Sequence, residues 1–145
     1  MKITANARYG LRILVDLAQN AGKDGAPRSV GEVARSQAIS EKFVSRLVAP
    51  LKKAGLVVAS RGAAGGLALA RPARRITVLE VVEAIQGPVA LVHCLAKPKS
   101  CPRIAHCGAN RMWAKANEAL RKSLASMNVA SVMGQGLSGQ GAHGA

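Results

Sequence analysis

All three cysteines of the chain lie within the fourteen-residue stretch CLAKPKSCPRIAHC, with six and then five residues between Cys94, Cys101 and Cys107. The deprotonated thiolate is the form of cysteine that binds metals, and the basic residues of the same stretch favour it by Coulomb attraction. Soft sulfur ligands select zinc, copper(I) or an iron–sulfur cluster. The cysteine pattern therefore predicts a binding site for a metal or a cluster.

A four-ligand shell needs one group besides the three sulfurs. The candidates nearest in the chain are His93, His106 and Asn110. A disulfide with one thiol left over, or three inert thiols, are the alternatives, but an odd number of cysteines without an export signal speaks against a disulfide framework. Pro98 and Pro102 within the stretch and Gly108 directly after it predict an irregular loop rather than a helix or strand.

The formal charge of the 145-residue chain is +14, and most of it lies in the first half. Residues 1–75 carry fourteen Lys or Arg against four acidic residues, whereas residues 76–145 carry seven against three. Such an excess favours a polyanionic partner, either nucleic acid or an acidic membrane surface. Arg8, Arg12 and Asp16 interrupt the apolar N-terminus, so we expect neither a signal peptide nor a membrane span, and a cytoplasmic location.

Three helices are predicted before residue 56. Apolar residues at steps of three and four indicate a first helix over residues 5–20. Ser29 and Glu32 have the spacing of a capping box and begin a short second helix, while Ser40 caps a third that Gly55 ends. Two short helices joined by a tight turn, the later one with a polar and basic outer face, indicate a helix-turn-helix.

One residue conflicts with the third predicted helix. Pro50 lies inside it, and proline in a helix removes a hydrogen bond at a cost of roughly 3 kcal/mol. We therefore expect a kink or break near Val48 that leaves the first turns intact.

A β hairpin is predicted directly after the helix-turn-helix. Residues 56–60 and 67–70 have strand composition, and the glycine-rich residues 61–66 form the tip between them. A hairpin in this place is a wing, and Arg61 at its tip could enter a narrow minor groove. A phosphate-binding loop is the weaker alternative, because no GK[ST] ending and no helix follow the glycines. The basic surface could also serve solubility alone.

The second half contains two further predicted helices. Thr77 and Glu80 form another capping box, and Gly87 with Pro88 ends the helix that it begins. A longer helix over about residues 109–128 has an apolar face with little chain left to cover it. The members of that face are Trp113, Ala116, Leu120, Leu124 and Met127. We expect this face to pair with a second copy in a twofold homodimer, with packing against its own domain as the alternative.

These segments together resemble the IscR, NsrR and RirA type of winged helix-turn-helix iron–sulfur transcription regulators. The resemblance covers roughly residues 1–130, and its carriers are the opening RYGLRILVDLA, the block ISEKFVSRLVAPLKKAGLV, the wing SRGAAGGLALA, the helix ITVLEVVEAIQGP and the three cysteines followed by Trp113. It implies a mostly α fold with a small β wing, divided into a DNA-binding domain at 1–75 and a cluster-binding loop and dimerisation helix at 76–130. The low-complexity composition near the end of the chain separately predicts a disordered tail at 131–145.

The resemblance also implies roles for particular residues. Cys94, Cys101 and Cys107 match the family's cluster ligands, for either a 2Fe–2S or a 4Fe–4S cluster. The residues implied to contact double-stranded DNA are Ser40, Lys42, Ser45, Arg46 and Arg61. The chain departs from the IscR-like pattern at Asn110, where a histidine is usual, and from the NsrR-like pattern at Arg8, where an acid is usual; His106 is then the expected fourth ligand, with a small exchangeable ligand as the alternative.

The expected function is that of a transcription regulator, a repressor rather than an activator, which senses iron, redox or nitric-oxide status and binds a pseudo-palindromic operator. A cluster-free regulator of the same fold that responds to thiol oxidation or zinc is the alternative. An enzyme with a cysteine nucleophile is not expected, because His93 and His106 adjoin cysteines in the same stretch and acidic partners are scarce.

Overall fold

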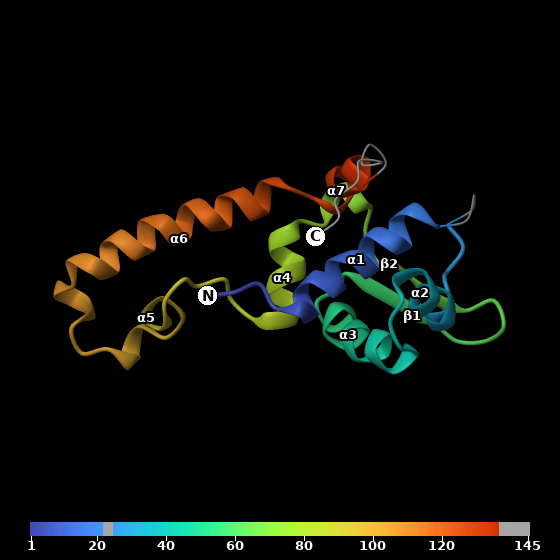
Figure 1. Cartoon of the computed structure of the whole chain (residues 1–145), viewed down its shortest axis with the longest axis horizontal. Coiled ribbons are helices and arrows are strands. Elements are labelled where there is room, and N and C mark those ends of the chain that lie inside the picture. The colour runs from blue at the N-terminus through green and yellow to red at the C-terminus, as the bar shows by residue number, and fades with distance from the viewer. Residues whose placement is uncertain (22–24, 137–145) are drawn as a thin grey trace.

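The computed structural model describes residues 1–21 and 25–136, and within them the fold is mostly helical with one small antiparallel sheet (Figure 1). The fold class expected from the sequence is confirmed. In chain order the elements are α1 (Ala5–Gln19), α2 (Val30–Gln37), α3 (Glu41–Lys53), β1 (Val57–Ser60), β2 (Gly66–Leu69), η1 (Ala73–Arg75), α4 (Val78–Gln86), α5 (His93–Ala96), η2 (Pro98–Ser100), η3 (Ile104–His106), α6 (Gly108–Ser126) and α7 (Val129–Gly136).

The core of the N-terminal part is aliphatic and lies around α1. Ile13, Leu14 and Leu17 of α1 are buried against Val44 and Leu51 of α3 and against the base of the hairpin. Burying such a side chain stabilises the fold by roughly 1.5–3 kcal/mol, so this shared core fixes the position of α3. The helix-turn-helix is therefore held from the inside, and its outer face is left free.

The helix starts expected from capping residues are confirmed. Ser29 and Glu32 form a reciprocal capping box at α2, Thr77 and Glu80 form another at α4, and the Ser40 hydroxyl accepts a hydrogen bond from the Phe43 N–H at the start of α3. Side-chain oxygens at these positions satisfy amides that have no partner within the helix.

A kink or break was expected near Val48, and the break is wrong, because α3 runs through Pro50 to Lys53. The Ala54 N–H donates to the Pro50 carbonyl at 3.0 Å and closes the last turn. Leu47, Val48 and Leu51 on either side of the proline are all buried. Their combined burial outweighs the roughly 3 kcal/mol that an internal proline costs.

The hairpin pairs β1 with β2 in antiparallel register, with Val57 opposite Leu69 and Ser60 opposite Gly66. A third segment joins its edge, because Arg28 and Leu67 exchange two backbone hydrogen bonds of 2.8 and 2.7 Å. Gly66 has a φ of +148°, and a Cβ there would lie 2.5 Å from the Arg28 carbonyl oxygen, so only glycine permits this close approach. The wing is thereby tied to the segment before α2.

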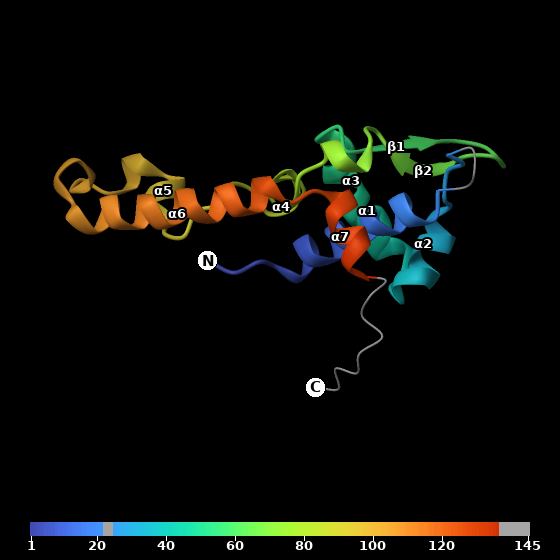
Figure 2. The same cartoon turned by 90° about the horizontal axis from the view of Figure 1, so that it is seen from above.

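The long helix α6 extends away from the winged part, with α5 beside its outer end (Figure 1 and Figure 2). Leu120 and Leu124, near the inner end of α6, pack against a small apolar cluster that includes Val78, Val82 and Val89. Met112 and Trp113, farther out, are 56% and 41% exposed. One part of the apolar face predicted for this helix thus packs within its own chain, and the outer part is exposed to solvent.

The disordered tail expected from residue 131 is wrong for residues 131–136, which belong to α7. The Val129 N–H donates to the Ile76 carbonyl and the Val78 N–H to the Met127 carbonyl, both at 2.9 Å. Val129 is fully buried in the main core. These contacts join segments about fifty residues apart, which helical periodicity alone cannot reveal, while residues 137–145 of the expected tail lie outside the described residues.

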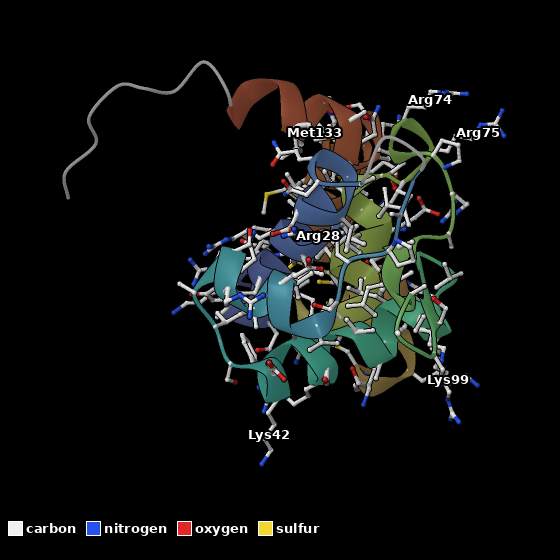
Figure 3. The ribbon with its side chains drawn as sticks, turned by 90° about the vertical axis from the view of Figure 1, so that its right-hand side faces the viewer. Arg28, Lys42, Arg74, Arg75, Lys99 and Met133 are labelled. Atoms are coloured by element: carbon white, nitrogen blue, oxygen red, sulfur yellow. The ribbon has the colours of Figure 1, made fainter. Side chains whose placement is uncertain are left out.

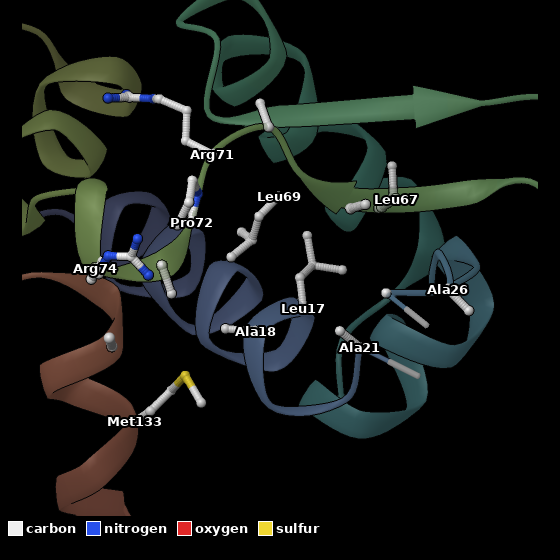
Figure 4. A pocket seen from close by; sticks show the side chains of 15 residues that line it. Leu17, Ala18, Ala21, Ala26, Leu67, Leu69, Arg71, Pro72, Arg74 and Met133 are labelled. Atoms are coloured by element: carbon white, nitrogen blue, oxygen red, sulfur yellow. The ribbon is translucent and has the colours of Figure 1, made fainter. Parts of the chain in front are cut away.

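Within residues 1–21 and 25–136 no helix is long and apolar enough to cross a membrane. A groove of about 630 Å³ lies between α1, β2, the connector at 70–74 and α7 (Figure 4). Leu17 and Leu69 contribute to its aliphatic lining, Met133 enters it from α7, and Arg71 and Arg74 also line it. Ala21, Gly25 and Ala26, between α1 and α2, also line the groove, and no lining residue belongs to the cysteine segment at 93–107.

Candidate functional site

The residues predicted to contact DNA lie on two neighbouring elements. Lys42, Ser45 and Arg46 are exposed on α3, and Arg61 is exposed where β1 ends. The Lys42 side chain points outward from the molecule (Figure 3). Ser40 is also exposed, but its hydroxyl already caps α3, so its role is partly to begin the helix. The first turns of α3 therefore offer a basic and polar face of the kind that enters a major groove.

A buried ion pair behind this face was missed by the sequence analysis. Asp16 is 1% exposed, and its carboxylate lies 2.9 Å from an Arg28 guanidinium nitrogen and accepts a hydrogen bond of 2.8 Å from Gln37 Nε2. A buried charge is tolerated only when it is paired and hydrogen-bonded. The available signal was an acidic residue on the apolar side of the first helix, between Val15 and Leu17.

Further contacts lead from Gln37 to α3, the later helix of the helix-turn-helix and its expected recognition helix. Arg12 Nε donates to Gln37 Oε1 at 2.9 Å, and the Arg12 guanidinium lies 4.8 Å from the centre of the Tyr9 ring. Tyr9 meets the Phe43 ring edge to face at 5.5 Å, and Arg46 lies 5.1 Å above Phe43. Two of the chain's three aromatic residues thus orient Arg46 on the outer face of α3.

The cysteine segment is more regular than the expected loop. Cys94 lies within α5, Cys101 lies between η2 and η3, and Cys107 caps α6. The prediction of an irregular loop is therefore wrong for α5 and for the two short helical turns. Short turns of this kind can form with proline at the first position, as at Pro98 in η2, because proline lacks only an N–H that would have no partner there.

Asn110 brings two of the three sulfurs together. Its side-chain Nδ2 donates to Cys94 Sγ at 3.2 Å, and its backbone N–H donates to Cys107 Sγ at 3.3 Å. Cys107 also lies at the N-terminus of α6, where the helix dipole favours negative charge. Both sulfurs thus accept a hydrogen bond from one residue in the first turn of α6. All three cysteines are half-buried free thiols.

The two histidines of the segment lie differently from Asn110. His93 is exposed on α5 and His106 is exposed on η3, next to Cys107 in the chain. Hydrogen bonds in the described part of the chain place Asn110, and not His106, against the sulfurs. Asn110 therefore meets these two sulfurs as a donor of hydrogen bonds.

The donor set fits a soft metal or cluster in kind but is not gathered into one site. Three cysteines supply the soft ligands that iron–sulfur clusters take. Among residues 1–21 and 25–136, however, no three His, Cys, Asp or Glu side chains lie close enough to hold a metal ion. Binding would therefore require the 93–107 segment to rearrange so that Cys101 joins the other two cysteines.

Polar contacts connect the cysteine segment to the winged part through α6 and α4. Asn117 of α6 accepts from the Leu91 N–H at 2.9 Å and donates to the Val89 carbonyl at 3.1 Å. Glu83 of α4 accepts from the Val89 N–H at 3.0 Å and pairs with Arg121 of α6. Residues 89–91, which lead from α4 into the cysteine segment, are therefore hydrogen-bonded to both α4 and α6.

Capping also affects the ionisation of Glu80 at the start of α4. Burial favours the neutral acid, but hydrogen bonds from the Thr77 N–H, from Arg71 and from the Thr77 hydroxyl favour the carboxylate more strongly together. The net result is a pKa of Glu80 below its ordinary value. Arg71 lies 2.9 Å from this carboxylate and so anchors the connector between the wing and α4.

The helix-turn-helix, the attached hairpin and the basic α3 together define a winged helix-turn-helix transcriptional regulator. Comparison with known proteins agrees with this class. A family model named Rrf2 and described as iron-dependent transcriptional regulator matches residues 3–135. Since this match covers most of the chain, the chain belongs to the Rrf2 family.

The family description and the printed names of several relatives are those of transcriptional regulators, in agreement with the expectation that the protein is not an enzyme. Protein rrf2 of Nitratidesulfovibrio vulgaris is 36% identical over 133 residues, which cover 92% of this chain and 87% of the relative. The solved structure of CymR, titled the global cysteine regulator of Bacillus subtilis, is 30% identical, has a TM-score of 0.76 and covers 93% of this chain and 98% of its own. The structure of IscR from T. potens is also 30% identical, with a TM-score of 0.71 and coverage of 99% and 94%.

Proposed function

We propose that this protein is a homodimeric repressor that senses iron, redox or nitric-oxide status through an iron–sulfur cluster held by Cys94, Cys101 and Cys107. The observation that carries the proposal is the convergence of Cys94 and Cys107 on Asn110 at the start of α6, with the third cysteine in the same segment. The description of the family model as iron-dependent and the similarity to IscR support it.

A bound cluster would supply reactivity toward oxygen, nitric oxide or peroxide, and would be lost when iron is scarce. The chain's own residues do the rest. Cys94 and Cys107 already share Asn110, and the segment between them folds so that Cys101 reaches them. His106 completes the ligand set in this proposal, or a small exchangeable ligand does so.

A change of structure in the cysteine segment would be transmitted to the DNA-binding part through α6. Asn117 and Arg121 of α6 hold residues 89–91 and Glu83, so a shift of α6 moves α4, which packs against α1. In a homodimer paired along α6, the same shift changes the separation of the two winged parts. Coupling of this kind is typically worth about 1–3 kcal/mol between two sites.

On DNA, Lys42, Ser45 and Arg46 read base edges in the major groove, Ser40 begins the helix that carries them, and Arg61 enters the minor groove. The net charge of +14 adds phosphate contacts that carry no sequence information. Two copies related by a twofold axis would bind the two halves of a pseudo-palindromic operator.

Anaerobic reconstitution with iron and sulfide tests this proposal. We expect a coloured protein that contains iron and sulfide in equal amounts, and a change of operator affinity of about tenfold between cluster-bound and cluster-free forms. The C101S variant is expected to lose iron while keeping its helical circular dichroism. Protein that binds no iron, or whose operator affinity is the same in both forms, would contradict the sensing function.

A second function, regulation by thiol oxidation or by zinc without a cluster, is favoured by a separate observation. The donors are not gathered into one metal site within the described residues, which favours thiol oxidation over zinc, and the similar CymR is titled a cysteine regulator. In this case iron would not bind, whereas operator affinity would still change after thiol oxidation or addition of zinc. The reconstitution experiment separates the two functions.

A further inference from the structure

The three cysteines do not have equivalent surroundings. In the part of the chain that the structure describes, the hydrogen bonds to sulfur go to Cys94 and Cys107, and both come from Asn110. Cys101 lies between these two along the chain, in an extended conformation between η2 and η3. The two cysteines farthest apart in the sequence are thus the pair that shares one residue.

We propose that Cys94 and Cys107 form an intrachain disulfide when the cluster-free protein is oxidised by a peroxide, and that Cys101 stays outside this pair. The inference goes beyond the proposed cluster, because it concerns the protein without metal and holds whether or not a cluster ever binds. A disulfide requires Cα atoms about 4.4–6.8 Å apart. The Cys94 and Cys107 sulfurs lie 3.2 and 3.3 Å from the side-chain and backbone nitrogens of Asn110, so forming the bond means drawing together two sulfurs that already meet one residue. The Asn110 amide must turn aside for the bond to form.

The order of the steps follows from the environment of each sulfur. Cys107, which caps the nineteen-residue helix α6 and accepts the Asn110 N–H, reacts first in this proposal. It attacks one oxygen of hydrogen peroxide, the O–O bond breaks, and the leaving hydroxide takes the thiol proton as water, which leaves a sulfenic acid on Cys107. Cys94 then attacks that sulfur, the S–O bond breaks, and the hydroxyl leaves as a second water. Two thiols have lost two electrons and two protons to one peroxide.

The sequence makes this pairing simple to map, because trypsin separates the three cysteines. Cleavage after Arg75, Lys99, Arg103 and Arg111 gives peptides 76–99, 100–103 and 104–111, each with one cysteine, since Pro98 protects the bond after Lys97. Metal-free full-length protein is treated with one equivalent of hydrogen peroxide, alkylated, digested without reductant and analysed by mass spectrometry. We expect peptide 76–99 linked to peptide 104–111, and peptide 100–103 alkylated.

Matched variants sharpen the result. C101S is expected to form the same linked peptides at a rate within about twofold of the natural chain, whereas C94S and C107S form no intrachain link. A main product that links peptide 100–103 to either neighbour, a link between two chains on a non-reducing gel, or sulfinic acid on Cys107 without any link would each overturn the proposal. Because iron and sulfide are counted separately in anaerobic protein, failure of the disulfide leaves the cluster proposal standing, and the reverse is also true.

Discussion

At the residue scale, Asn110 is the side chain through which the two paired sulfurs can be perturbed without disturbing the fold. Asn110→Asp keeps the size of the side chain and places an acid in the first turn of α6, where acids are favoured. It replaces a donor to Cys94 by a negative charge close to the sulfurs of Cys94 and Cys107. We expect alkylation of Cys94 and Cys107 by iodoacetamide to slow by roughly threefold to tenfold, because like charge disfavours the thiolate.

Cys101 is the internal control in the same experiment. It makes no contact with Asn110 among the described hydrogen bonds, and its rate is expected to change by less than about twofold. An equal slowing at all three cysteines would show that Asn110 acts on the whole segment and not on the pair.

Asp16 is the residue on which the packing of α1 against α2 depends. Asp16→Ala leaves the Arg28 guanidinium and the Gln37 amide without their buried partner, so we expect a loss of roughly 2–4 kcal/mol in the free energy of unfolding. Chemical denaturation followed by circular dichroism measures it. Glu118→Ala on the exposed side of α6 is the control, because its contact to Lys122 is a surface pair of 3.9 Å. Similar losses for the two variants would contradict a special role for Asp16.

At the element scale, the wing is distinguished from other basic surface by Arg61. Arg61→Ala is expected to weaken operator binding by about tenfold and to lower the slope of log affinity against log salt by about one. Arg74→Ala removes the same charge from η1, which in Figure 3 lies at the opposite end of the molecule from Lys42 on the recognition helix. Fluorescence anisotropy at several salt concentrations compares them, and an equal effect of both changes would indicate only diffuse attraction.

The capping box of α4 gives the fold a defined response to acid. The folded state lowers the pKa of Glu80, so this residue contributes stability above its ordinary pKa of 4.5, and the contribution is lost as pH falls through the lowered folded pKa. Glu80→Gln should therefore lower the melting temperature near neutral pH and have a smaller effect in acid. Thermal unfolding at several pH values measures this, with Glu118→Gln as the control. A difference between Glu80→Gln and the natural chain that stays constant with pH would contradict the assignment.

Some structural features are determined by residues close in the sequence, and others depend on contacts between distant segments. Ser29, Ser40 and Thr77 were sufficient to predict where three helices begin, because a cap acts within four residues of itself. The predicted break near Val48 and the predicted disorder of residues 131–136 were wrong. The burial of Leu51 and the pairing of Val129 with Ile76 depend on segments far away in the sequence. Likewise, the three cysteines were visible in the sequence, but their unequal partnership through Asn110 follows from how α5 meets α6.

At the scale of the whole molecule, the exposed outer part of α6 is the surface on which the proposed homodimer depends. Leu120 and Leu124 are used within the chain, whereas Met112 and Trp113 are 56% and 41% exposed on a helix that projects from the winged part (Figure 2). Exposed apolar side chains of this size lose contact with water when a second α6 packs on them. We therefore expect the double change of Met112→Glu and Trp113→Glu to convert the dimer to a monomer, measured by analytical ultracentrifugation.

The same variant should bind an operator with two half-sites at least tenfold more weakly than the natural chain, because each winged part then binds without its partner. Its affinity for a single half-site should change much less, since α3 and the wing are untouched. Lys115→Glu is the control, because it alters charge on the exposed surface of the same helix without removing apolar area. A variant that stays dimeric would locate the twofold contact elsewhere, and one that loses half-site binding as well would indicate damage to the fold rather than to the pairing.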